Sequence, residues 1–252
     1  MQGYLETTKS IYKDAAGNPQ VGLCCTTTPD WQLPGLSIPQ KMLQMNYGCG
    51  STVHPRDLVN RPKNSIYVAA QNFLFNIFKH DDLRKALKEM YRVLKPRGRL
   101  ILSDPISESE MPNALKNDER LRALCLSGSL PLKQYIGMIA EVGFGTIEVR
   151  PKRPYRVLDP HNYDTEELIF IESVEVCAIK DPMPVDGPCV FTGETAIYYG
   201  VKDFFDDEKG HVLFANQPLA VCDKTADALA SLERDDIFIS GSSFFYDGGG
   251  CC

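Results

Sequence analysis

The middle of the chain alternates between apolar runs and amphipathic stretches, as expected for a sheet covered by helices. Residues 65–75, SIYVAAQNFLF, form a continuous apolar run of strand length, typical of a strand buried on both faces of a parallel sheet. In residues 80–98, apolar side chains recur at helical spacing, at Leu83, Leu87, Met90 and Leu94. Acidic residues begin this stretch, and Pro96 and Gly98 end it, so it predicts a helix.

The pattern continues in the same order. Residues 99–104, RLILSD, predict a second strand, and Pro131 opens a helix that Gly143 ends. Residues 145–157, GTIEVRPKRPYRV, predict a third strand that runs into a proline-broken loop. Strand, helix and strand in this order indicate the back half of a doubly wound, Rossmann-like α/β sheet.

After about residue 155 the sequence becomes rich in β patterns separated by glycines and prolines. This change predicts a smaller, mostly β C-terminal unit that ends in the tail YDGGGCC. We therefore expect an N-terminal segment over 1–63, an incomplete α/β domain over 64–155, and the C-terminal domain with its tail over 156–252.

Composition and charge narrow the class of partner. The chain has 252 residues, 43% of them hydrophobic and 24% charged, with a net charge of −6. An acidic chain without a basic block is an unlikely partner for nucleic acid or an anionic membrane, so we expect it to bind a small molecule or a protein.

The N-terminal residues do not have the pattern of a secretory signal, and no apolar run reaches the ~20 residues of a membrane span. We therefore expect a cytoplasmic protein.

The chain has nine cysteines. Thiols in the cytosol are mostly reduced, so we expect some of these cysteines to have a role other than forming disulfides. There is no CxxC motif, so a zinc ribbon or a thioredoxin-type pair is not favoured. The bland alternative for each cysteine is a buried apolar thiol, and we expect this for Cys177. The four histidines are scattered, and we expect them to be surface or hydrogen-bonding residues.

Several motifs together resemble the S-adenosylmethionine-dependent arsenite methyltransferases. They are YGCG, EMYRVLKPRGRLILSDP, RALCLSGSLPLKQYIGMIAEVGF and VCDKTADAL. The segments GLCCTTTP and YDGGGCC resemble, more narrowly, the branch associated with arsenosugar biosynthesis. The resemblance implies methyl transfer from S-adenosylmethionine to As(III), with arsenite or its thiol conjugates as substrate and a thiol reductant as partner.

The same resemblance implies the ligands. It assigns As(III) binding to the thiolates of Cys49, Cys125 and Cys189, which carry the YGCG, CxxG helix-entry and PCVFTG motifs. Further candidate ligands are Cys24, Cys25 and Cys222. As(III) is soft, so thiolates are its preferred ligands, and a pyramidal three-thiolate centre leaves a lone pair that can attack an electrophilic methyl group. Alignment and exclusion of water would then supply most of the rate.

One part of the family pattern is missing. The first strand, its glycine loop and the following acidic residue have no room between Leu58 and Ser65, which indicates an internal deletion. What remains for the cofactor is Gln71 and Asn72, at the end of the strand in 65–75. We therefore expect impaired methyl transfer, and an apolar strand edge left by the lost neighbour. Two alternatives stay open: a non-catalytic arsenite-binding remnant, and a redox or zinc-binding protein that uses the CC pairs.

Overall fold

The computed structural model describes residues 3–17, 67–163 and 165–244. The helical elements are α1 (Tyr4–Gly17), η1 (Phe75–Ile77), α4 (His80–Val93), α5 (Asn113–Lys116), α6 (Glu119–Ala123), α7 (Leu132–Val142), α8 (Pro160–Tyr163) and α9 (Asp223–Ala230). The strands are β1 (Val68–Asn72), β2 (Arg99–Ser107), β3 (Leu130–Pro131), β4 (Thr146–Leu158), β5 (Ile169–Ile179), β6 (Cys189–Phe191), β7 (Thr195–Tyr198), β8 (Phe204–Asp206), β9 (Val212–Phe214), β10 (Leu219–Ala220) and β11 (Ile237–Ile239).

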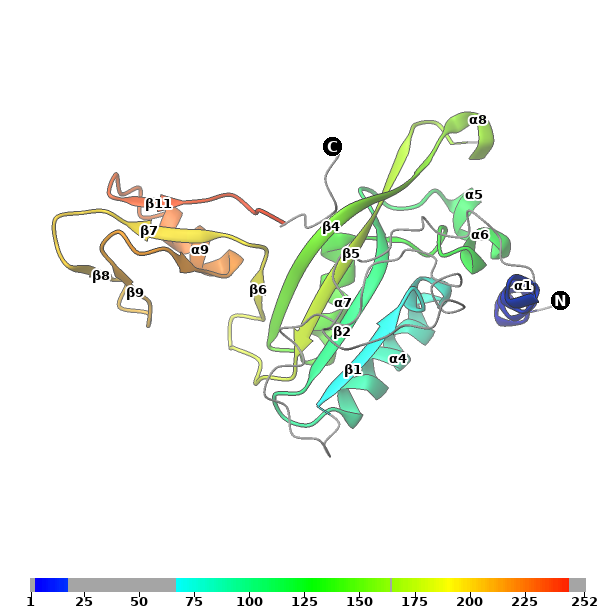
Figure 1. The fold of residues 1–252 in the computed structure, drawn as a ribbon, viewed down its shortest axis with the longest axis horizontal. Coiled ribbons are helices and arrows are strands. Elements are labelled where there is room, and N and C mark those ends of the chain that lie inside the picture. Colours follow the sequence, from blue (N-terminus) through cyan, green and yellow to red (C-terminus); the bar gives the residue numbers. More distant parts are fainter. Residues whose placement is uncertain (1–2, 18–66, 164, 245–252) are drawn as a thin grey trace, which may run out of the picture.

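A six-stranded mixed sheet forms the centre of the molecule, in the order β1-β2-β5-β4-β6, with β3 paired to β2 (Figure 1). β1 and β2 are parallel, whereas β5 lies antiparallel between β2 and β4. The helices predicted around Leu87 and after Pro131 are α4 and α7, and Gly143 ends α7 with a left-handed φ of 114°. The expected α/β class is confirmed.

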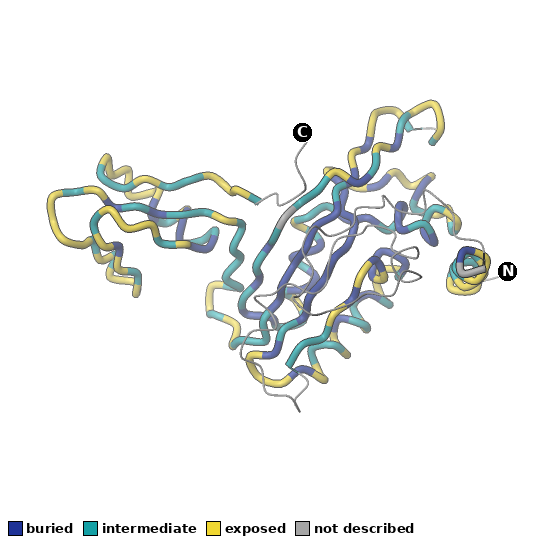
Figure 2. The backbone as a smooth tube through the Cα atoms, in the orientation of Figure 1, coloured by how far each residue is buried: buried dark blue, intermediate teal, exposed yellow. Residues whose placement is uncertain are grey.

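Helices α4 and α7 lie side by side against one face of this sheet (Figure 1). Leu87 of α4 and Ile139 of α7 are fully buried against strand residues such as Leu102 and Val176. The buried side chains follow the strands of the sheet, as the dark blue segments of Figure 2 show. No helix in the described ranges is long and apolar enough to cross a membrane.

The main sheet extends further along the chain than the sequence indicates. The proline-broken loop expected after Arg150 is instead the second half of β4, which continues to Leu158. Pro151 and Pro154 lie at two irregularities of the β4–β5 ladder, where a missing N–H is tolerated. The expected boundary between residues 155 and 156 therefore falls inside β4, and β5 belongs to the main sheet rather than to the C-terminal unit.

The C-terminal unit begins after β6 and is small and mostly β. It contains the three-stranded sheet β10-β7-β11, the β8–β9 hairpin and helix α9, and it extends away from the main sheet (Figure 1). Its own core includes Tyr198, Leu213 and Leu229. A smaller, mostly β unit is confirmed, although it starts later than expected.

Strand β1 lies at the end of the main sheet, where it pairs with β2 among the described residues. Ala70 and Asn72 are exposed and Gln71 is buried. The expected apolar edge left by a lost neighbour stays a prediction, because residues 18–66 lie outside the described residues. The segment in which the glycine loop would be missing, between Leu58 and Ser65, lies outside the described residues.

Candidate functional site

Two cysteines far apart in sequence meet where the main sheet joins the C-terminal unit. Cys189 begins β6, which pairs with the start of β4, and Cys222 immediately precedes α9. Both are free thiols; Cys189 is half-buried and Cys222 is buried. Burial raises the pKa of the Cys189 thiol, and the neighbouring Cys222 raises it further. We call these two residues the C-terminal thiol pair.

A lysine and a carboxylate stand beside this pair. Lys224 donates from Nζ to Asp186 Oδ1 and to the Gly187 carbonyl oxygen, at 2.8 Å each. The charge of Lys224 opposes the rise in the Cys189 pKa, whereas the charge of Asp186 adds to it. The ammonium group therefore offsets only part of the rise in the Cys189 pKa, and the net effect keeps Cys189 as a thiol.

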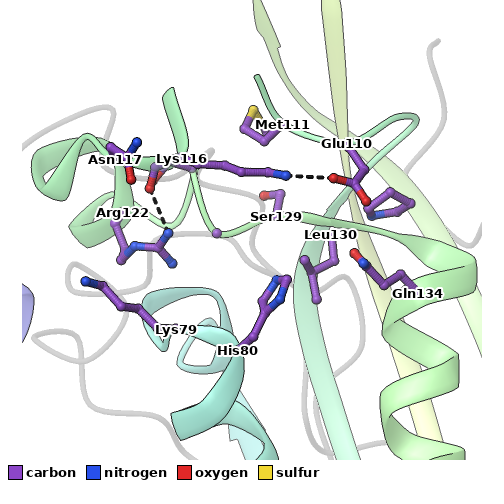
Figure 3. A pocket seen from close by; sticks show the side chains of 13 residues that line it. Lys79, His80, Glu110, Met111, Lys116, Asn117, Arg122, Ser129, Leu130 and Gln134 are labelled. Carbon is purple, nitrogen blue, oxygen red and sulfur yellow. Dashed lines mark hydrogen bonds and ion pairs between the residues drawn. The ribbon is translucent and has the colours of Figure 1, made fainter. Parts of the chain in front are cut away.

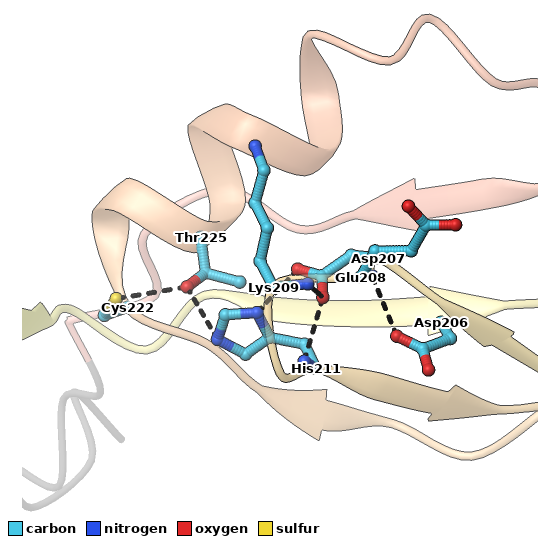
Figure 4. A network of polar contacts seen from close by, with 7 residues as sticks. All are labelled: Asp206, Asp207, Glu208, Lys209, His211, Cys222 and Thr225. Carbon is cyan, nitrogen blue, oxygen red and sulfur yellow. Dashed lines mark hydrogen bonds and ion pairs between the residues drawn. The ribbon is translucent and has the colours of Figure 1, made fainter.

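A chain of polar contacts connects Cys222 to the β8–β9 hairpin (Figure 4). Cys222 Sγ lies 3.4 Å from Thr225 Oγ1, and the latter lies 3.2 Å from His211 Nε2. His211 Nδ1 in turn lies 2.6 Å from Asp207 Oδ2. Although burial opposes it, hydrogen bonds from His211 and from the Lys209 backbone hold the pKa of Asp207 below its ordinary value. These contacts fix the orientation of the hydroxyl group that the Cys222 thiol faces.

Cys125 lies in a different environment. It does not enter a helix but ends α6, in the left-handed backbone conformation (φ 60°) that usually belongs to glycine at this position. Its side chain is 1% exposed, donates to the Phe73 carbonyl oxygen at 3.2 Å and lies 3.6 Å from the Tyr12 hydroxyl. Phe73 is also left-handed, with φ 54°. The left-handed conformation of Cys125 follows from its position directly after the C-cap of α6.

The structure does not bring Cys125 to the C-terminal thiol pair. Cys125 contacts Phe73, whose ring packs on Tyr155 in the second half of β4, whereas Cys189 pairs with Thr146 at the beginning of β4. About 30 Å of strand separates these two points, at roughly 3.3 Å for each residue. Among the described residues, no three His, Cys, Asp or Glu side chains are grouped to hold a metal ion.

The other predicted ligands are not placed. Cys24, Cys25 and Cys49 lie outside the described residues, as do Cys251 and Cys252. Cys177 is fully buried in the middle of β5, where it neighbours β2 and β4. This confirms the expectation of a core thiol for Cys177.

A buried carboxyl group lies next to one of the predicted cofactor residues. Gln71 donates from Nε2 to Asp104 Oδ2, and the same oxygen accepts from the Tyr135 hydroxyl at 2.5 Å. Burial raises the pKa of Asp104 to about 7, although the hydrogen bonds from Tyr135, Gln71 and the Phe75 backbone oppose this rise. Asp104 is thus close to half-protonated at neutral pH, the property of a group poised for proton transfer or of a strained core acid.

Gln71 and Asn72 are the described residues predicted to contact S-adenosylmethionine. The Gln71 amide is already engaged, since its oxygen accepts from the Leu74 N–H at 2.9 Å and its nitrogen faces Asp104. A Cβ at Gly128 would lie 1.7 Å from the Asn76 carbonyl oxygen, so this close approach serves the packing of the chain itself. Asn72 is exposed at the edge of the sheet. We therefore derive no chemical step through this cofactor.

Comparison with known proteins connects these features to a family. Residues 37–102 match the family model of a methyltransferase domain. An arsenite methyltransferase of Aquipseudomonas alcaligenes is 30% identical over 95 residues, which are 38% of this chain and 27% of that protein. Over these segments the chain is similar to a methyltransferase domain and to arsenite methyltransferases.

Two further proteins are similar to this chain. An arsenite methyltransferase of Halobacterium salinarum is 27% identical over 88 residues, 35% of this chain and 22% of that protein. The structure also matches in part the crystal structure of an arsenic(III) S-adenosylmethionine methyltransferase from Chlamydomonas reinhardtii. The match covers 72% of this chain and 62% of that protein, with 21% sequence identity and a TM-score of 0.42. The chain spans about a quarter of the length of these curated relatives.

The sequence did not reveal several of the side-chain contacts described above. The meeting of Cys222 with Cys189 has no spacing signal, and neither does the Tyr135–Asp104 bond. Asp104 could have been found from the sequence, because it directly follows the apolar run RLILS. A carboxylate next to a buried strand must be paired or protonated. The Asp207–His211 spacing within one turn was a signal of the same kind.

Proposed function

We propose that this chain binds trivalent arsenic through cysteine thiols, as the substrate-binding step of arsenite methyl transfer, and that its methyl transfer is impaired. The observation that supports the arsenic site is the C-terminal thiol pair, Cys189 and Cys222, with Lys224 beside it. Chelation by two thiols at one place is the arrangement that a soft, thiophilic centre selects.

The binding reaction needs no co-reactant. Arsenous acid exchanges an As–OH group for an As–S bond at each thiol, and each thiol proton leaves with the hydroxide as water. Two exchanges at Cys189 and Cys222 release two waters and leave one As–OH group. That third position is open to another thiol, such as the sequence-predicted ligand Cys49 or an external thiol reductant.

The finer assignments follow the resemblance. We propose arsenite or its thiol conjugates as substrate, a role in arsenosugar biosynthesis and detoxification, a thiol reductant as partner, and a cytoplasmic location. Gln71 and Asn72 remain the proposed contacts to S-adenosylmethionine. The C-terminal unit, together with β6, is the proposed arsenic-binding domain, and Cys24 and Cys25 are proposed to capture arsenite.

The proposal that methyl transfer is impaired rests on different observations from the arsenic site. It rests on the family's glycine loop, for which the sequence has no room between Leu58 and Ser65, and on the Gln71 amide, which already donates to Asp104. A non-catalytic arsenite-binding remnant is therefore the second candidate. It differs from an impaired enzyme only in whether any methylated product forms.

The test titrates the purified chain first with arsenite and then with S-adenosylmethionine, by intact mass and calorimetry, followed by product analysis. We expect an arsenite adduct, no measurable cofactor binding and negligible methylated arsenic. Absence of an arsenite adduct would contradict the arsenic proposal. Tight cofactor binding with steady methylation would contradict the impairment and show a working methyltransferase.

A further inference from the structure

A cavity of about 260 Å³ lies between the start of α4, the α5–α6 region and the turn before β3 (Figure 3). In Figure 1 the α5–α6 region lies away from β6, and α6 packs against η1 and α1. Three cationic side chains line it, Lys79, Lys116 and Arg122, together with His80 and one carboxylate, Glu110.

Arg122 is the most buried of these charges, with 9% of its surface exposed. Its guanidinium donates to the Phe78 carbonyl oxygen at 3.2 Å and to the Lys116 carbonyl oxygen at 2.9 Å. These bonds use two of its five N–H donors. Within the described residues its hydrogen-bond partners are thus carbonyl oxygens, and Glu119 acts on it only through its charge. A buried cation in this situation favours an anion nearby.

The charges around the cavity are not balanced. Lys116 Nζ pairs with Glu110 Oε2 at 2.6 Å, and the Lys79 ammonium lies over the Tyr4 ring, 5.1 Å from its centroid. Burial lowers the pKa of His80, and the charges of Arg84, Lys116 and Arg122 lower it further, so its ring is neutral at pH 7. Three cations against Glu110 leave a net charge of +2 in the lining.

The start of α4 adds to this field. The helix begins at His80 and has 14 residues, and its N-cap residue Lys79 makes no side-chain capping bond. The N-terminal N–H groups of a helix carry partial positive charge and favour anions. Asp81 and Asp82 in its first turn do not line the cavity; they pair with Arg84 and Lys85.

We propose that this cavity binds the phosphate group of a small phosphate monoester. A phosphate dianion neutralises the net charge of the lining, whereas a carboxylate leaves one positive charge in place. The guanidinium of Arg122 presents the planar donor pattern that phosphate oxygens accept. Met111 and Leu130 supply an apolar surface for the organic part of the ligand, and the volume limits that part to a single small ring or chain.

Calorimetry with phenyl phosphate at low ionic strength tests this proposal, with benzoate as the carboxylate counterpart and inorganic phosphate as the minimal anion. We expect one phenyl phosphate to bind per chain and benzoate to bind at least tenfold more weakly. Lys116→Gln and Lys79→Gln should each weaken binding about fivefold, the size of one partly solvated charge contact. Glu110→Gln should tighten it, because that carboxylate competes with the ligand for Lys116.

The matched control is Lys88→Gln, an exposed lysine on the same helix α4 that does not line the cavity. It should bind phenyl phosphate as the unchanged chain does, and so should Cys189→Ser, because the thiol pair is a separate site. The proposal is overturned if phenyl phosphate does not bind at millimolar concentration, if Lys88→Gln weakens binding as much as Lys116→Gln, or if benzoate binds equally well.

Discussion

Changing either Cys189 or Cys222 to serine is expected to lower the affinity of the C-terminal thiol pair for arsenite by roughly 100-fold or more. The second As–S bond forms within the molecule, so its loss removes the high effective concentration that chelation supplies. Serine keeps the size of the side chain but presents a hard oxygen that competes poorly for As(III). Calorimetric titration with arsenite measures the change.

The other cysteines must be separated from this pair. A full-length background in which the five cysteines outside the described residues are serine leaves Cys125, Cys177, Cys189 and Cys222. In this background, Cys177→Ala is the matched control, since it removes a buried thiol of the main sheet. If Cys177→Ala and Cys189→Ser lower the affinity for arsenite equally, the thiol pair is not the binding site.

Cys125→Ser distinguishes the thiol pair from the three-thiolate centre. Cys125 contacts Phe73, which packs on Tyr155 in the second half of β4, whereas Cys189 pairs with the beginning of β4, so we expect replacement of Cys125 to leave tight arsenite binding intact in this background. A loss equal to that of Cys189→Ser would mean that the chain closes to bring these thiols together, as the family resemblance implies.

Asp104→Asn is expected to flatten the pH dependence of the free energy of unfolding between about pH 4 and pH 7. Burial raises the pKa of Asp104 in the folded chain from 3.8 to about 7. Below pH 4 both states carry the protonated acid and folding is not penalised. As the pH rises, the unfolded chain loses the proton first, so folding loses stability until the pH passes 7. A shift of this size corresponds to about 4 kcal/mol.

The asparagine variant keeps an oxygen for Tyr135 and Gln71 but carries no charge. It should therefore match the unchanged chain near pH 4 and exceed it in stability at pH 8, as measured by urea denaturation across this range. Asp227→Asn, which changes an exposed carboxylate on α9, is the control and should leave the slope as it is. An equally steep slope in Asp104→Asn would show that Asp104 does not titrate in this window.

Local patterns predicted the elements but not their partners. Helix α4 could be found because its buried residues Leu83 and Leu87 follow helical spacing, and α7 because Pro131 and Gly143 mark its ends. Strand β5 was assigned to the C-terminal unit because the apolar run in 166–179 suits any sheet. Its place between β2 and β4 depends on pairing with residues far away in sequence, which the run itself does not encode.

The candidate site shows the same limit. Motif resemblance indicates Cys189 and Cys222 as separate candidates, but they are 33 positions apart with strands β7 to β10 between them, so no spacing rule could pair them. Cys125 was grouped with Cys189 through the family alone. The structure gives each its own neighbours, and it shows that the glycine-like conformation of Cys125 follows from its position at the end of α6.

Site-resolved alkylation under native conditions tests the central claim most directly, that Cys189 and Cys222 bind the same arsenic atom. Trypsin separates the two thiols into different peptides, residues 181–202 and 210–224, so mass spectrometry reads each one independently. With one equivalent of arsenite, we expect the alkylation of both to slow together, and Cys177 to react as it does without arsenite. Unchanged alkylation of Cys189 and Cys222 under arsenite saturation would contradict the account.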